Sequence, residues 1–199
     1  MKDPFANEIT KARRHLPHWR ADNAIYWVTF RLADSIPHDT LQAWRAERDY
    51  WVECQPPPWD EAAWREYNER FGDRYEKWLD AGMGSCALAN PDVRDVVRKS
   101  LTHFNGERLT LHAAVIMPTH THCLLEPLGG FQLSKLLGSI KGFSAHEANK
   151  ILARSGTFWQ DESYDHIVRS EAQYNFFVKY IQENPVKAKL PEGMYWVYA

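Results

Sequence analysis

The stretch Val115-Ile-Met-Pro-Thr-His-Thr-His-Cys-Leu-Leu-Glu126 decides how this chain folds, because two apolar runs flank a Met-Pro-Thr break and two histidines open the second run. Alternate side chains of a β-strand lie on the same face, so we expect His120 and His122 to point the same way. Two buried imidazoles are costly unless something binds them, and a divalent metal is the natural candidate. In a chain with nine histidines such a pair also arises by chance. The stretch therefore predicts a strand and leaves a metal site and a coincidence equally open.

Further elements follow from the spacing of apolar residues on either side of this stretch. Strands are expected at residues 25–33, 108–117 and 119–126, with short ones at 158–160 and 164–168. Helices are expected at residues 39–54, 90–104, 133–152 and 170–184. Asp39 is the expected cap of the first helix, a Ser170 capping box opens the last, and Pro185 is expected to end it. This order of elements predicts an α+β fold with an antiparallel sheet.

The middle of the chain, residues 35–103, is acidic and mostly helical in pattern. Residues 34–100 contain fourteen Asp and Glu against nine Lys and Arg. Aromatic residues recur there at helical spacing and so share one face: Trp64, Tyr67, Phe71, Tyr75 and Trp78. Such a stripe is either core or a platform for stacking bases, and its acidic flanks favour the core. We expect a single domain, residues 1–199, with a helical insertion at about 35–103.

Composition and charge narrow the class of protein. The chain has 199 residues, of which 44% are hydrophobic, and can bury a sizeable core. With no long apolar run, no signal-peptide pattern and three widely spaced cysteines, it is expected to be cytoplasmic and not membrane-bound. Its net charge of −2 argues against a protein that binds nucleic acid by bulk electrostatics alone. A basic arm at residues 13–20 is read either as a solvated terminus or as a phosphate contact.

A second pair of polar residues lies near the end of the last expected helix. Tyr180 and Asn184 are four residues apart and therefore share one face of that helix. The ordinary interpretation is a tyrosine that anchors the helix and an asparagine that caps it before Pro185. The alternative is that both belong to a site, which periodicity alone favours less.

The two pairs together resemble the single-tyrosine HUH transposases, in particular their REP-associated branch, a family of bacterial single-stranded DNA endonucleases. The resemblance rests on His-x-His after Met-Pro and on Tyr180-Ile-Gln-Glu-Asn-Pro-Val-Lys-Ala188. Further matching positions are Phe158-Trp-Gln160, Asp165-His166, Arg169 and Lys141. It covers about residues 13–34 and 104–190. Thr121 departs from the bulky hydrophobic residue usual at the middle of the motif, but it points away from the expected metal face.

The resemblance implies a ferredoxin-like sheet, similar to that of RNA-recognition motifs, with helices packed on it. It implies that His120 and His122 bind one divalent metal, Mn²⁺ or Mg²⁺, with Asn184 as the third ligand. Tyr180 would be the nucleophile. Contacts to DNA are implied for Arg14, Lys141, Trp159, Gln160 and Arg169. For Lys141 and Arg169 the alternative is an ordinary surface cation, and for Trp159 it is a place in the core.

The implied activity is metal-dependent cleavage and rejoining of single-stranded DNA near REP-type hairpins through a 5′-phosphotyrosine intermediate. The implied partner is single-stranded or hairpin DNA, bound by a monomer or a homodimer in the bacterial nucleoid. Two alternatives stay open. One is a domesticated hairpin-binding protein that no longer cleaves, and the other is a hydrolase in which the metal activates water.

Overall fold

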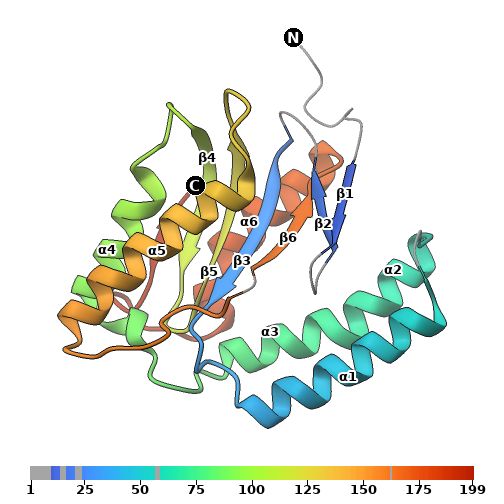
Figure 1. Cartoon of the computed structure of the whole chain (residues 1–199), viewed down its shortest axis with the longest axis horizontal. Coiled ribbons are helices and arrows are strands. Elements are labelled where there is room, and N and C mark those ends of the chain that lie inside the picture. Colours follow the sequence, from blue (N-terminus) through green and yellow to red (C-terminus); the bar gives the residue numbers. More distant parts are fainter. Residues whose placement is uncertain (1–9, 14–16, 21–23, 57–58, 162) are drawn as a thin grey trace.

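The computed structural model describes residues 10–13, 17–20, 24–56, 59–161 and 163–199 (Figure 1). Its main sheet contains β3 (Tyr26–Arg31), β4 (Leu109–Ile116), β5 (His120–Pro127), β6 (Tyr164–Ile167) and β7 (Trp196–Tyr198). Their order is β6-β3-β5-β4-β7, and every neighbouring pair is antiparallel. A separate pair, β1 (Thr10–Arg13) and β2 (Pro17–Arg20), contains part of the expected basic arm. Arg14 lies outside the described residues.

The path of the chain through the sheet confirms the expected fold class. Strand β3 is followed by α4 (Pro91–Thr102) and the adjacent strands β4 and β5, and then by α5 (Leu133–Ile151) and β6. This β-α-β-β-α-β path with β3 and β5 in the centre is the ferredoxin-like arrangement. The fifth strand, β7, extends the sheet beside β4 and had no counterpart in the expected elements.

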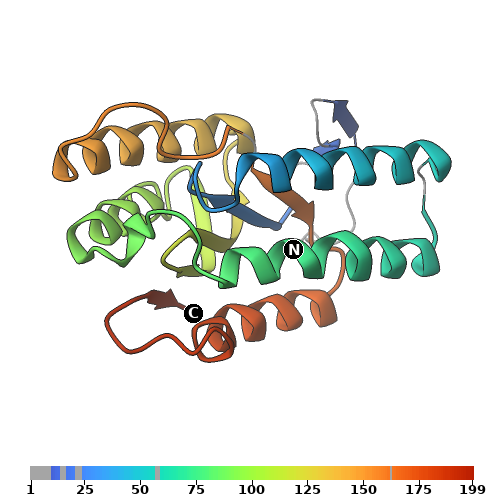
Figure 2. The ribbon, with the colours of Figure 1, turned by 90° about the horizontal axis from the view of Figure 1, so that it is seen from below.

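Helices cover the two faces of the sheet unequally. Figure 2 shows α4 and α5 on one side and α6 (Glu171–Lys187) on the other. The period of a strand divides its residues accordingly: Tyr26, Val28 and Phe30 pack in the core beneath α4 and α5, whereas Trp27 packs beneath α6. His120 and His122 lie on the same face as Trp27, because they stand opposite Arg31 and Thr29 in the β3–β5 register. The candidate site therefore lies under α6.

The segment between β3 and α4 forms what we call the helical arm, residues 38–80. It contains α1 (His38–Cys54), α2 (Glu61–Tyr67), a π-helical turn (Asn68–Gly72) and α3 (Asp73–Asp80). Figures 1 and 2 show α1 lying alongside α2 and α3 and extending past the edge of the sheet. The arm has its own apolar cluster, built on Trp44, Trp51 and Phe71. Tyr67, Tyr75 and Trp78 pack against that cluster, as the aromatic stripe predicted, whereas the side chain of Trp64 lies outside the described residues.

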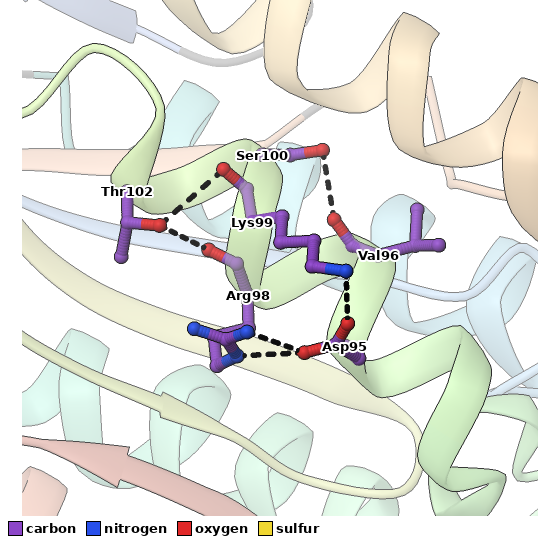
Figure 3. Close-up of polar contacts among 6 residues, drawn as sticks. All are labelled: Asp95, Val96, Arg98, Lys99, Ser100 and Thr102. Atoms are coloured by element: carbon purple, nitrogen blue, oxygen red, sulfur yellow. Dashed lines mark hydrogen bonds and ion pairs between the residues drawn. The ribbon is translucent and has the colours of Figure 1, made fainter.

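Helix α4 shows how local sequence fixes an element of the core. Asn90 caps it by accepting a hydrogen bond from the Asp92 amide, and Pro91 occupies its first turn. On its exposed side Asp95 pairs with both Arg98 and Lys99, while Ser100 and Thr102 bond back to carbonyls one turn earlier (Figure 3). Each such ion pair is worth only about 0.2–0.5 kcal/mol. The buried Val93, Val97 and Leu101 hold α4 to the sheet.

Two expected helix ends were wrong. Helix α6 continues through Pro185 to Lys187 instead of ending at Asn184. A proline forfeits one amide hydrogen bond, and so close to a helix end that loss is small. At α1 the capping position is Pro37 and not Asp39, which lies in the first turn. None of the described helices is long and apolar enough to cross a membrane.

Candidate metal centre

The two histidines open strand β5 and point to the face covered by α6. Both are fully buried, and their ring centroids are 4.6 Å apart. Burial and the neighbouring His122 hold the pKa of His120 well below its usual value. A neutral imidazole is the form that binds a metal. Because both histidines point to the face of β5 that α6 covers, the prediction that the pair shares one face of a strand is confirmed.

The proton on His120 can be located from its neighbours. The Thr119 hydroxyl donates its only hydrogen to the Leu79 carbonyl of the helical arm, 2.9 Å away. The same hydroxyl lies 2.9 Å from His120 Nδ1, so it must accept a hydrogen bond from that nitrogen. The remaining nitrogen, Nε2, consequently carries a free lone pair. It is buried and has no hydrogen-bond partner.

His122 is held from two sides. Its Nδ1 lies 2.7 Å from the Thr29 hydroxyl of β3, and its ring stacks on Trp27 at a centroid distance of 4.9 Å and an interplanar angle of 17°. Phe177 of α6 also stacks on the same indole. The Nε2 atom of His122 makes no hydrogen bond, like that of His120. Both imidazoles are fixed at Nδ1 and leave Nε2 for a ligand, an arrangement common among metal-binding histidines.

Glu76 of α3 brings a carboxylate to this pair. Ligand atoms of Glu76, His120 and His122 all lie within 4.8 Å of one another, as expected of residues that share a metal ion. Glu76 Oε2 is 3.3 Å from His122 Nε2, but the two atoms do not form a hydrogen bond. Sequence reasoning missed this residue. Its only signal was a place beside Tyr75 in the aromatic stripe, which says nothing about the histidines.

Tyr180 approaches the pair from α6, and Asn184 lies one turn after it on the same helix. The Tyr180 hydroxyl donates a hydrogen bond to Glu76 Oε2 at 3.3 Å, and its ring packs edge-on against His122 at 5.6 Å. Asn184, one turn later, is 2% exposed, and its Oδ1 is buried without a hydrogen-bond partner. A buried amide oxygen left unpaired is costly, so it is suited to meeting a cation. One protein chain thus brings the tyrosine and the histidines together.

Charged groups of both signs surround Tyr180: Glu76 and Asp80 lie nearby, and the Lys187 ammonium is 5.3 Å from the centre of its ring. Burial is the main cause that raises the pKa of the Tyr180 phenol above its usual value, and Glu76 and Asp80 raise it further. Burial and the nearby Glu76 also raise the pKa of Asp80 to about 6. The phenol is therefore held in its protonated form, even with Lys187 nearby. A positive charge among these groups would favour the phenolate.

The residues expected to contact DNA fall in different surroundings. Trp159 is 4% exposed, donates to the Ser144 hydroxyl and packs edge-on against Phe30, so it belongs to the core and does not line a DNA path. Lys141 Nζ donates to the carbonyls of Gln160 and Asp161 and to the Ser163 hydroxyl, which ties α5 to the loop before β6.

The other two residues expected to contact DNA lie nearer the candidate metal centre. Gln160 and Arg169 both line the cleft that also contains Tyr180. Thr121, the irregular middle residue of the motif, points to the opposite face as expected, since its neighbours His120 and His122 face α6. Its hydroxyl is buried there without a partner.

The donor groups around the pair fit a divalent metal. Three buried polar atoms, His120 Nε2, His122 Nε2 and Asn184 Oδ1, have no hydrogen-bond partner, and Glu76 adds a carboxylate. Two imidazoles with carboxylate and amide oxygens form a mixed nitrogen and oxygen set, which suits Mn²⁺ or Mg²⁺. The site is therefore chemically able to hold a metal next to a tyrosine hydroxyl.

Known proteins provide an independent comparison. Two solved structures are similar. One is a REP-associated tyrosine transposase bound to a REP hairpin, with 17% identity, a TM-score of 0.44 and coverage of 82% of this chain and 67% of that one. The other, from Deinococcus radiodurans R1, is named as a candidate transposase, with 16% identity, a TM-score of 0.37 and coverage of 80% and 88%. No curated protein sequence matches the chain. Residues 88–184, which include both histidines, Tyr180 and Asn184, match the family model described as Transposase IS200 like. Over these residues, a little under half of the chain, the protein is similar to the IS200-like transposases.

Proposed function

We propose that this protein is a metal-dependent single-stranded DNA endonuclease and strand transferase that acts near REP-type hairpins through a 5′-phosphotyrosine intermediate. The observation that carries the proposal is the position of the Tyr180 hydroxyl. It shares a carboxylate oxygen of Glu76 with His122, at 3.3 Å from each. A nucleophile beside a set of metal donors is suited to metal-assisted phosphodiester cleavage by a tyrosine.

In this proposal His120, His122 and Asn184 hold Mn²⁺ or Mg²⁺, and Glu76 provides a further oxygen. When bound, the metal supplies positive charge that polarises the scissile phosphate. The chain itself fixes the donors: Thr119 and Thr29 hold the two imidazoles at Nδ1. Trp27 and Phe177 close one side of the site and keep water from the face of His122.

The transfer step needs no external energy source, because each phosphorus–oxygen bond that breaks is replaced by another. Tyr180 Oη forms a bond to the phosphorus of a DNA phosphodiester as its proton passes to water, and the bond from phosphorus to the 3′ oxygen breaks. That oxygen takes a proton and leaves as a 3′-hydroxyl. Attack of another 3′-hydroxyl on the phosphotyrosine reverses the exchange and restores the phenol, so rejoining needs no ATP. The hydrogen bond to Glu76 orients the phenol for the first attack.

A covalent capture experiment tests the proposal. The full-length protein is incubated with Mn²⁺ and a pool of 3′-labelled oligonucleotides in which a REP-type hairpin is flanked by random single strands, and adducts are separated on a denaturing gel. We expect a labelled adduct with the unmodified protein and none with Tyr180→Phe. Tyr174→Phe, which alters a tyrosine on the same helix that lies beside His112, is the matched control and should still form the adduct. An adduct that survives Tyr180→Phe would refute the assignment.

The same experiment separates the two alternatives. The His-His-Glu cluster is also suited to activating water, which makes a metal-dependent hydrolase the second candidate. A hydrolase would release cut DNA without an adduct and would tolerate Tyr180→Phe. A hairpin-binding protein without cleavage would give neither fragment nor adduct on the denaturing gel, but would shift the same DNA on a native gel run in parallel. Because Tyr180 and both histidines come from one chain, the proposal requires only a monomer, acting on DNA in the bacterial cytoplasm.

A further inference from the structure

A cleft of about 820 Å³ lies between the helical arm and the body of the protein. One wall comes from α1 and α3 of the arm, and the other from β3, β6 and α6. Glu76 and Tyr180 are among its lining residues, so the cleft is continuous with the candidate metal centre. Its volume suits a small organic ligand better than a single ion.

Arg31 lines this cleft and is the most unusual charge in it. Its side chain is 2% exposed and stands opposite His120 in the β3–β5 register. Nε donates to the Tyr75 hydroxyl, and Nη1 donates to the Ser35 hydroxyl and the Leu32 carbonyl. Nη2 is buried without a hydrogen-bond partner, and no carboxylate in the described part of the chain pairs with the guanidinium.

A buried arginine without an anion is energetically unfavourable. Desolvation of an ion costs several kcal/mol, and neutral hydroxyl and carbonyl partners recover only part of it. The planar guanidinium matches the oxygens of a phosphate group and can present two donors to it. The cleft beside Arg31 therefore has the chemistry of a phosphate site.

The remaining walls of the cleft suit a nucleotide rather than free phosphate. Trp44 and Tyr75 of the arm line it together with the cation Arg45, and with Arg48, which pairs with Asp49 and lies over the Trp44 ring. Aromatic side chains mixed with cations are the usual surface for single-stranded nucleic acid, because each base can stack while the backbone is neutralised. Trp27, by contrast, is already stacked on His122 and on Phe177.

We propose that this cleft binds the nucleotide next to the scissile phosphate of single-stranded DNA. Arg31 binds its backbone phosphate, and aromatic residues of the helical arm contact its base. The inference rests on the proposed function, because that function places the scissile phosphate at Tyr180. It makes the arm one half of the DNA site, although the arm lies outside the residues that match the transposase family.

Binding of deoxynucleoside 3′,5′-bisphosphates to the full-length protein in the presence of EDTA tests the inference. The chelator excludes binding through a metal, and tryptophan fluorescence reports occupancy because Trp44 lines the cleft. We expect saturable binding of at least one of the four bisphosphates, with thymidine and inorganic phosphate at least about tenfold weaker. Arg31→Gln should weaken binding by about tenfold or more, as loss of a hydrogen bond to a charged group does. Arg98→Gln, which alters a half-buried arginine paired with Asp95 on α4 (Figure 3), is the matched control and should bind normally.

A second measurement avoids dependence on a variant that fails to fold. In the unmodified protein the nuclear magnetic resonance signals of Arg31 Nε–H and the Trp44 indole should shift on binding, whereas that of Arg98 Nε–H should not. Absence of saturable binding, an unshifted Arg31 signal, or a folded Arg31→Gln variant that binds normally would each overturn the inference. Adduct formation on hairpin DNA needs no bisphosphate binding. A protein that forms the adduct but fails here would lose only the inference, whereas one that binds here but forms no adduct would lose the proposed function.

Discussion

The body of the protein and the helical arm contribute to the candidate centre in different ways. The body supplies His120, His122, Tyr180 and Asn184, which follow the two-residue period of a strand and the four-residue period of a helix. The arm supplies the Glu76 carboxylate from a helix about forty residues before the histidines in the chain. The first set lies within the match to the transposase family and the second outside it. The comparison teaches that periodicity identifies groups aligned by one element, but not a group delivered by packing between distant elements.

The largest effect on Mn²⁺ binding is expected when a metal ligand supplied by the body of the protein is removed. His122→Ala should weaken Mn²⁺ binding by more than about 100-fold, because the loss of even an outer partner of a metal ligand costs about 10–100-fold. Isothermal titration calorimetry on the full-length protein measures this. His146→Ala, an exposed histidine on α5, should leave the affinity unchanged. Equal affinities for the two variants would show that the body does not form the metal site.

Removing the arm's carboxylate addresses the other side of the comparison. Glu76→Gln keeps the shape of the side chain but removes its charge, so Mn²⁺ affinity should fall by about tenfold, within the range of charge-assisted contacts. The same titration measures it, with the exposed Glu69→Gln of the π-helical turn as the control. If Glu76→Gln binds Mn²⁺ as tightly as the control, the arm only covers a centre that the body completes by itself.

A smaller effect on Mn²⁺ binding is expected at Thr119, the residue through which the helical arm contacts His120. Thr119→Val removes the acceptor that fixes the Nδ1 proton of His120 and the contact to the Leu79 carbonyl. Mn²⁺ affinity should fall by about tenfold at most, the lower end of the outer-partner range. Thr110→Val on β4 is the control for loss of a strand threonine. A full loss of binding would mean that Thr119 maintains the fold and does not merely orient the histidine.

The smallest effect concerns the middle residue of the motif. Thr121→Val should raise the free energy of unfolding by about 1 kcal/mol, because it removes a buried hydroxyl that has no partner. Urea denaturation measures the change, and Mn²⁺ affinity should stay constant because the side chain faces α4 and α5. Destabilisation by this substitution would indicate that the hydroxyl has an unseen water or protein partner.

The fold and half of the site could be predicted from the sequence because their signals are local. Alternation fixed the face of His120 and His122, and helical spacing placed Tyr180 beside Asn184. The extension of α6 past Pro185 could not be predicted, because the helix end depends on packing as well as on proline. Arg31 gave no signal either, since a lone arginine in an aromatic strand matches no motif. Its burial opposite His120 appears only when β3 and β5 pair.

The way the arm joins the body has a consequence for how such a protein can vary. The chain leaves the body at Asp34, after β3, and returns at Gly84. The positive φ of Gly84 lets its backbone pass against the Asp34 carbonyl, where a Cβ would be 2.3 Å from the oxygen. The Ser85 amide donates to the Asp34 carboxylate and closes the same junction. Entry and exit are therefore adjacent, and everything between them is a cassette whose length can change without shifting the register of the sheet. We expect relatives to exchange this cassette as a unit and to alter the DNA they recognise while keeping the histidines and tyrosine in place.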